Sequence, residues 1–184
     1  SALAGLFGET PSDYVSTLAW ALLQDRDASD LLGRSPALDA LADRAVSFVY
    51  FGGGTPSVLP LARLRTLVDA LQRVAPWPGA REVTFECAPK SVTDDKMRFL
   101  RDAGVTRLSL GVQEMDDAVL AANGRVHLVR DVERAWEVIR RAGFGIVNVD
   151  LIVGLVQETD ESFFQSLDRV MGLGPESVTI YQLE

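Results

Sequence analysis

The sequence contains only one cysteine and one histidine, Cys87 and His127, among its 184 residues. A disulfide framework is therefore excluded, and so is any metal site built only from the Cys and His side chains of this chain. We expect Cys87 to be a small buried side chain rather than a nucleophile, because no histidine accompanies it nearby in the sequence. His127 lies in a polar connection, where a solvated or helix-capping role is favoured over catalysis.

Positive charge is also scarce, because 18 Lys and Arg stand against 26 Asp and Glu, for a formal net charge of -8. With no cluster of basic residues, nucleic acids and anionic membranes are poor candidates as partners. No apolar stretch approaches the ~20 residues of a membrane span, and residues 1–10 lack the basic start and cleavage site of a secretory signal. We therefore expect a cytoplasmic protein whose residues 1–184 fold as one globular domain.

Five short apolar runs have the length and the β-branched content of strands. These runs are Val46–Phe51, Glu82–Glu86, Arg107–Val112, Ile146–Ile152 and Ser177–Leu183. Segments with apolar residues at helical spacing lie between them. Strands that alternate with helices and are joined by short loops predict an α/β fold, with a parallel sheet and right-handed crossovers.

Helix boundaries are marked by caps and glycines. A helical stripe begins at Leu61, Thr93 is placed to cap a helix that Gly104 ends, and Thr159 begins another with acidic residues in its first turn. We also predict a helix opened by Asp131 and closed by Gly143, and an amphipathic helix at about Pro11–Gln24.

Polar and glycine residues gather where the predicted strands end, which is where ligands bind in parallel α/β folds. These residues are Gly52, Gly53, Gly54, Thr55 and Pro56 after the first strand, Glu86 after the second, Gln113 after the third, Asp150 in the fourth, and Tyr181, Gln182 and Glu184 in the last. Three successive glycines suit a loop whose backbone touches a ligand. Asp150 interrupts an apolar run, where an unpaired buried carboxylate is unfavourable.

Each of these residues also has a purely structural interpretation. The glycines are explained by a tight turn without a ligand. Glu86 is explained as a helix cap or a solvent-facing side chain, and Gln113 by a hydrogen bond to a neighbouring loop. Asp150 is explained by a salt bridge to a structural arginine. The shared position of all of them at one edge of the sheet favours a ligand site.

Five stretches, "VYFGGGTPS", "EVTFECAPKSVT", "LRDAGVTRLSLGVQEMDDAVL", "NVDLIVGL" and "ESVTIYQL", occur in this order. Together they resemble the strand-end signatures of the radical S-adenosylmethionine (SAM) superfamily, in the branch of oxygen-independent coproporphyrinogen III oxidase and its relatives (HemN/HemW-like). The resemblance covers residues 46–184. It implies a partial (β/α) barrel of six parallel strands that is open at one side, with about five of the strands in this chain.

The resemblance also implies a set of SAM contacts. The loop from Gly52 to Thr55 would lie along the methionine part of SAM and offer backbone groups to its ammonium. Glu86, Gln113, Arg125 and Asp150 match the polar contacts of the family. Arg125 suits the SAM carboxylate, and the other three suit the ribose hydroxyls or the ammonium.

One departure concerns the [4Fe-4S] cluster, which the family binds through three cysteines spaced C-x3-C-x2-C after its first strand. This sequence has no such motif. We therefore interpret the chain as part of a larger enzyme, without the first strand, the cluster loop and the C-terminal extension. The alternative is a natural relative without a cluster, but the retained ligand positions would then have little use. The stretch "GLVQET" also lacks the proline that often follows "GL" in the family.

The leading hypothesis is a radical SAM enzyme. Such an enzyme cleaves SAM reductively to a 5′-deoxyadenosyl radical, takes electrons from a donor such as flavodoxin or ferredoxin, and acts on a porphyrinogen-like or other small organic substrate. Alternatives within the branch are a methyltransferase or a cyclopropane-forming enzyme with a second SAM, and a non-catalytic heme chaperone with His127 as the one available ligand. A phosphate-binding glycine loop is a further reading, but no Lys-Ser/Thr pair follows the glycines as in a P-loop.

Overall fold

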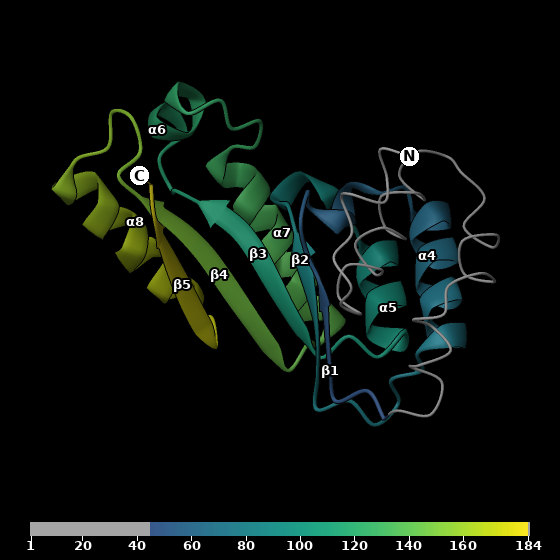
Figure 1. The fold of residues 1–184 in the computed structure, drawn as a ribbon. Helices are drawn as coiled ribbons and strands as arrows, with labels where there is room; N and C mark the ends of the chain where they lie inside the picture. Colours follow the sequence, from purple (N-terminus) through teal and green to yellow (C-terminus); the bar gives the residue numbers. More distant parts are fainter. Residues whose placement is uncertain (1–44, 184) are drawn as a thin grey trace, which may run out of the picture. The chain divides into compact units, whose positions relative to one another are not determined.

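The computed structural model describes residues 45–183 of the chain. The helix predicted at Pro11–Gln24 and the side chain of Glu184 therefore lie outside the described residues. The described part contains a five-stranded parallel sheet in the order β1-β2-β3-β4-β5 (Figure 1). Its strands are β1 (Phe48–Phe51), β2 (Glu82–Cys87), β3 (Arg107–Gln113), β4 (Ile146–Val153) and β5 (Ser177–Gln182). The predicted α/β fold is confirmed, and the predicted strand ends fall within two residues of those observed.

Helices separate the strands along the chain. They are α4 (Leu61–Val74), α5 (Asp94–Asp102), α6 (Asp117–Ala122), α7 (Val129–Ala142) and α8 (Asp160–Leu173), with single 3-10 turns η1 (Pro56–Val58) and η2 (Pro89–Ser91). The predicted caps are confirmed, because the Thr93 hydroxyl accepts the amide of Lys96 and the Thr159 hydroxyl accepts the amide of Ser162. The sequence reading did not predict the short helix α6.

The predicted start of α7 was wrong by two residues. The helix begins at Val129, and Asp131 lies in its first turn. There the Asp131 carboxylate accepts the amide of Leu128 at 3.0 Å. An acidic side chain in this position satisfies one of the free amides at a helix start. Asp131 therefore does mark the start of the helix, but from inside the first turn and not from the residue before the helix.

The described residues form two compact units. One contains residues 45–48 and 59–81. Its helix α4 buries a stripe made by Leu64, Leu67 and Val68, which are at most 2% exposed. The amide of Arg81 donates to the carbonyl of Ser47 at 2.9 Å in the same unit.

The second unit contains residues 49–58 and 82–183, and it holds β2–β5 with α5–α8. Alternate strand residues are fully buried apolar side chains, namely Phe85, Leu108, Leu110, Val147 and Val149. Because side chains alternate across a strand, the residues between them lie on the opposite face of the sheet. That opposite face is polar. Within residues 45–183, no helix combines the length and the apolar character that crossing a bilayer requires.

Candidate functional site

The loop after β1 and the end of β2 form one hydrogen-bonded unit. The carboxylate of Glu86 accepts the Tyr50 hydroxyl at 2.6 Å and the Gly53 amide at 3.1 Å. Burial and the hydrogen bond to Glu86 raise the pKa of Tyr50 well above its usual value. A Cβ atom on Gly52 would overlap the Tyr50 ring and lie 2.7 Å from Glu86 Oε1, closer than real side chains approach. Glycine at position 52 therefore leaves space for the carboxylate.

The next residues explain the rest of the glycine run. Gly53 and Gly54 have φ angles of 75° and 64°, and Thr55 follows with 58°. Three consecutive residues in the left-handed region are unfavourable for side chains with a Cβ, and glycine lowers that cost at the first two. Both glycines are exposed, with open space where a Cβ would lie. The loop thus presents bare backbone next to Glu86.

Two neutral donors hold the Asp150 carboxylate on β4. The Ser109 hydroxyl donates to Oδ2 at 2.7 Å, and the Asn148 amide donates to Oδ1 at 2.8 Å. Burial raises the pKa of Asp150, whereas these two hydrogen bonds and the charge of Arg107 lower it. Within residues 45–183, Asp150 forms no ion pair. Among the described residues, Asp150 is therefore not held by a salt bridge to a structural arginine.

The charges of Glu86 and Asp150 act on one another and on two tyrosines. Asp150 first, then burial and Glu86, raise the pKa of Tyr181. Asp150 and Tyr181 also add to the raised pKa of Tyr50. These residues come from β1, β2, β4 and β5, so the sheet brings its carboxyl ends together as the sequence predicted. In the described part of the chain neither carboxylate has a cationic partner in an ion pair, and the site is negative.

Gln113 ends β3 in an unusual backbone conformation. Its φ angle is 69°, and the register of β3 on β4 shifts between Gly111 and Gln113. A Cβ on Gly111 would lie 2.8 Å from Gln113 Nε2, so the amide lies over this glycine. Gly111 is the register partner of Asp150. The Gln113 amide has no hydrogen-bond partner among the described residues, which leaves it available beside Asp150.

Arg125 lies in the loop between α6 and α7, and its side chain is exposed. Only its backbone is anchored, because its amide donates to the Leu120 carbonyl at 2.9 Å. Among residues 45–183 the guanidinium forms no ion pair. The structure therefore brings Glu86, Gln113, Asp150 and the glycine loop to one face of the sheet, and it does not bring Arg125 into contact with them.

The prediction that His127 is solvated or caps a helix was wrong. His127 is 7% exposed, and its Nε2 lies 2.9 Å from the carbonyl oxygen of Val112. If Nε2 carries the proton, it donates to this carbonyl, and the hydrogen bond links the loop that contains Arg125 to Val112 of β3. The prediction for Cys87 is confirmed, since it is buried and burial raises the pKa of its thiol to about 12. Across residues 45–183 no group of His, Cys, Asp and Glu side chains is arranged to hold a metal ion.

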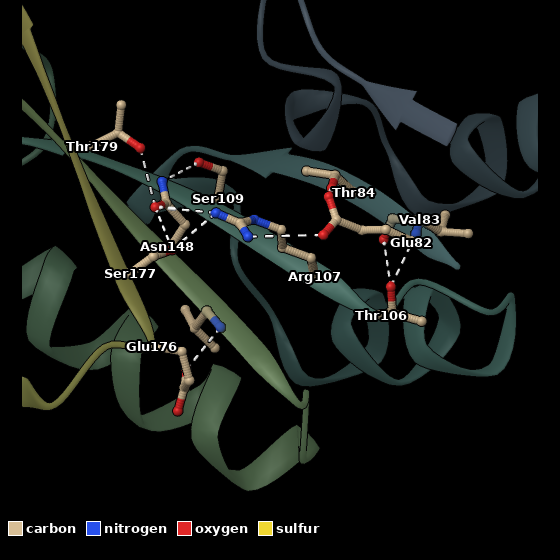
Figure 2. A network of polar contacts seen from close by, with 11 residues as sticks. Glu82, Val83, Thr84, Thr106, Arg107, Ser109, Asn148, Glu176, Ser177 and Thr179 are labelled. Atoms are coloured by element: carbon tan, nitrogen blue, oxygen red, sulfur yellow. Dashed lines mark hydrogen bonds and ion pairs between the residues drawn. The ribbon is translucent and has the colours of Figure 1, made fainter. Parts of the chain in front are cut away.

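Sequence reasoning missed a polar network on the same sheet face, which Figure 2 shows around Asn148. Two of its members, Ser109 and Asn148, hydrogen-bond Asp150 and orient it. Asn148 Oδ1 accepts the hydroxyls of Ser177 at 2.7 Å and Thr179 at 3.1 Å. With its oxygen occupied, the Asn148 amide donates to Ser109 and Asp150. Arg107 joins the network through Ser177 at 2.9 Å and through an ion pair with Glu82 at 3.8 Å. The signal was present as polar residues at every second position of β3, β4 and β5.

Comparison with known proteins identifies the family. The model of the radical SAM superfamily matches residues 36–170. The chain is similar to the heme chaperone HemW of Bacillus subtilis (strain 168), with 35% identity over 136 residues that cover 73% of this chain and 36% of the relative. It is also similar to an oxygen-independent coproporphyrinogen III oxidase of Cereibacter sphaeroides, with 34% identity over 133 residues, covering 72% of this chain and 29% of the relative.

The fold matches a solved structure of the same group. Coproporphyrinogen III oxidase (HemN) from Escherichia coli, described as a radical SAM enzyme, superposes with a TM-score of 0.75 and 29% identity over 95% of this chain and 37% of that chain. The chain thus spans about a third of the length of these relatives, whose covered shares are 36%, 29% and 37%.

Proposed function

The chain belongs to the radical SAM superfamily, and from that premise we propose that the carboxyl ends of its strands bind SAM in an enzyme of the coproporphyrinogen-oxidase-like branch. The proposed contacts are Gly52, Gly53, Gly54, Thr55, Glu86, Gln113, Arg125 and Asp150. The substrate is proposed to be porphyrinogen-like or another small organic molecule, and the electron donor a small redox protein such as flavodoxin or ferredoxin.

The observation that carries the proposal is the pair of carboxylates on one sheet face. Glu86 is held by Tyr50 and Gly53, and Asp150 by Ser109 and Asn148, so neutral donors fix both. A fixed carboxylate without a cation beside it suits an ammonium, a sulfonium or a hydroxyl. SAM carries all three groups. The donor set therefore fits SAM, and the exposed glycine backbone adds further polar groups beside Glu86.

The residues of this chain do not fit the iron–sulfur cluster in the same way. A cluster takes several thiolate ligands, whereas Cys87 is the one cysteine in the sequence. That thiol is buried, and burial raises its pKa to about 12, which disfavours the thiolate. No step of the mechanism is therefore assigned to a cluster held by these residues.

The residues themselves are proposed to bind, orient and shield. When bound, SAM would supply the radical chemistry of the reaction, which belongs to the cofactor and not to these side chains. Glu86 and Asp150 orient the bound molecule at two points of the sheet, and two-point fixation lowers the entropic cost of reaching a reactive geometry. Gln113 supplies a neutral amide between them.

The test is SAM affinity in the full-length gene product, measured by calorimetry. We expect Glu86→Gln and Asp150→Asn each to weaken binding by about 1.5–3 kcal/mol, the range for hydrogen bonds to charged groups. Asp168→Asn, which removes an exposed carboxylate from α8, is the matched control and leaves the affinity unchanged. Unchanged affinity in both site variants, with the protein folded, would refute the proposal.

Similarity to the heme chaperone HemW supports a second candidate function, heme binding. His127 is a poor heme ligand in the described structure, because it is buried and its Nε2 contacts the Val112 carbonyl. Heme titration of the wild type and of His127→Ala separates the candidates. A Soret shift that is lost in His127→Ala favours the chaperone with His127 as its ligand, and a shift retained in the variant assigns any heme site to other residues.

A further inference from the structure

Two carboxyl groups from different loops meet in the described structure, and each has one buried oxygen. Glu114, directly after Gln113, has no exposed surface, and Glu158 lies in the loop between β4 and α8. Each has one oxygen that is fully bonded. Glu114 Oε1 accepts the amide of Met115 at 2.7 Å and the hydroxyl of Ser166, and Glu158 Oε2 accepts the amides of Gly154 at 2.6 Å and Leu155 at 3.3 Å.

The other oxygen of each group is buried and has no donor. Glu114 Oε2 and Glu158 Oε1 are the only side-chain polar atoms of residues 45–183 that are buried without a hydrogen-bond partner. A buried acceptor without a donor is costly, and two ionised carboxylates side by side are more costly still. One proton placed between the two oxygens removes both costs.

We propose that Glu114 and Glu158 share a single proton, and that this carboxyl pair ties the loop after β3 to the loop after β4 and so positions Gln113. The part that concerns Gln113 rests on the proposed function. The pair consists of positioning residues, because within residues 45–183 neither hydrogen-bonds Glu86, Asp150 or Gln113.

The charges around the pair agree with a retained proton. Burial raises the pKa of Glu114 to about 7, the Met115 amide opposes this rise, and the hydrogen bond to Glu158 and its charge add to it. Asp116, which caps the start of α6, contributes a further negative charge. Arg169 of α8 brings a positive charge to the neighbouring residue, because it donates to the Met115 carbonyl at 2.6 Å, and it also pairs with Glu133 of α7 at 3.4 Å. No cation of the described residues pairs with either Glu114 or Glu158.

Neutral groups also hold the loop between β4 and α8 in place. The Asn123 side chain at the end of α6 accepts the Val156 amide at 3.0 Å and donates to the Val156 carbonyl at 2.9 Å. Loss of the shared proton therefore does not release the loop. It places two negative charges in a buried contact and forces the Glu114 end, next to Gln113, to move apart from Glu158.

The sign of the pH dependence follows from linkage. Glu114 holds its proton more tightly in the folded protein than in the unfolded chain, so the folded state binds more protons between the two pKa values. Stability is therefore full below the ordinary pKa of a glutamic acid and is lost as the pH rises toward about 7. The loss is complete once the proton has left the folded pair.

The experiment compares the wild type with Glu114→Gln and Glu158→Gln in the full-length protein. Each amide replaces the shared proton with a permanent N–H donor facing the remaining carboxylate. Between pH 5 and pH 8 we expect the wild-type melting midpoint to fall by on the order of 5 °C more than that of either variant. The double variant places two NH2 groups face to face and is expected to melt below both single variants. Asp168→Asn is the control and follows the wild type.

A second readout is SAM affinity over the same pH range. We expect the affinity ratio of Glu114→Gln to wild type to be near one at pH 5.5 and to rise roughly threefold or more by pH 8. Equal pH dependence of the melting midpoint in the wild type and both single variants would overturn the shared proton. A pH-dependent midpoint with a constant affinity ratio would overturn the positioning of Gln113. Absence of SAM binding at every pH would refute the proposed function, while the melting data would still decide the shared proton.

Discussion

Replacing Ser109 with alanine tests how the protein holds the Asp150 carboxylate. Ser109 is 6% exposed, and its hydroxyl donates to Asp150 Oδ2 at 2.7 Å. The change removes this bond and leaves the Asn148 amide on Oδ1. Alanine adds no atoms, so the backbone of β3 has no reason to move. The perturbation is therefore the loss of the neutral bond that Ser109 accepts from the Asn148 amide at 3.0 Å, and of one hydrogen bond to a half-buried charged group.

Such a bond contributes about 1.5–3 kcal/mol to the free energy of unfolding. For a domain of this size, 1 kcal/mol corresponds to about 2–4 °C in the melting midpoint, so the variant is expected to melt roughly 3–12 °C lower. The folded-state pKa of Asp150 is already raised by burial, and losing Ser109 raises it further. A raised acid pKa costs stability as the pH rises through it, so the loss grows with pH and shrinks once Asp150 is protonated.

The matched control is Thr179→Val. Thr179 Oγ1 bonds Asn148 Oδ1 at 3.1 Å in the same network and donates nothing to Asp150. Loss of a neutral hydrogen bond costs about 0.5–1.5 kcal/mol and carries no pH dependence from Asp150. The assay is the melting midpoint of both variants at acidic and neutral pH, together with SAM affinity at neutral pH. Equal losses for the two variants, or a Ser109→Ala loss that does not change with pH, would refute this account of Asp150.

Three further outcomes are expected. Gly52→Ala should weaken SAM binding more than Gly145→Ala, because only the first Cβ lies against Glu86, and equal calorimetric affinities would contradict the role of that glycine. Arg125→Ala should weaken SAM binding by about 1.5–3 kcal/mol. Its free energy of unfolding should stay within about 0.5 kcal/mol of the wild-type value, because the side chain is exposed and outside an ion pair. Lost stability with unchanged SAM affinity would remove Arg125 from the site. Cys87→Ser should leave the iron and sulfide content of the full-length protein unchanged after anaerobic reconstitution, and this chain alone should bind neither in stoichiometric amounts.

The strand ends were readable from the sequence because each depends on local chemistry. Consecutive glycines favour a loop with positive φ angles, which Gly53 and Gly54 have. A carboxylate within an apolar run requires hydrogen-bond donors, and Asp150 has two. Parallel strands place their carboxyl ends at one edge whatever the details of packing, so Glu86 and Asp150 could be brought together from spacing alone.

What the sequence did not reveal depends on pairs that are distant along the chain. The Glu114–Glu158 contact joins two loops that no local pattern relates. His127 was read as solvated because it follows the polar stretch Asn123–Arg125, yet it is buried and its Nε2 lies 2.9 Å from a carbonyl acceptor. The side chains of Arg107, Ser109 and Asn148 alternate with apolar residues, and that alternation marks a polar sheet face only when it is read across several strands.

The most direct test of the SAM site is a crystal structure of the full-length protein with bound SAM. The account predicts that carboxylate oxygens of Glu86 and Asp150 lie within hydrogen-bond distance of SAM, with the backbone of Gly52–Gly54 beside its methionine part. SAM bound with neither carboxylate in contact, or bound on another face of the molecule, would contradict it.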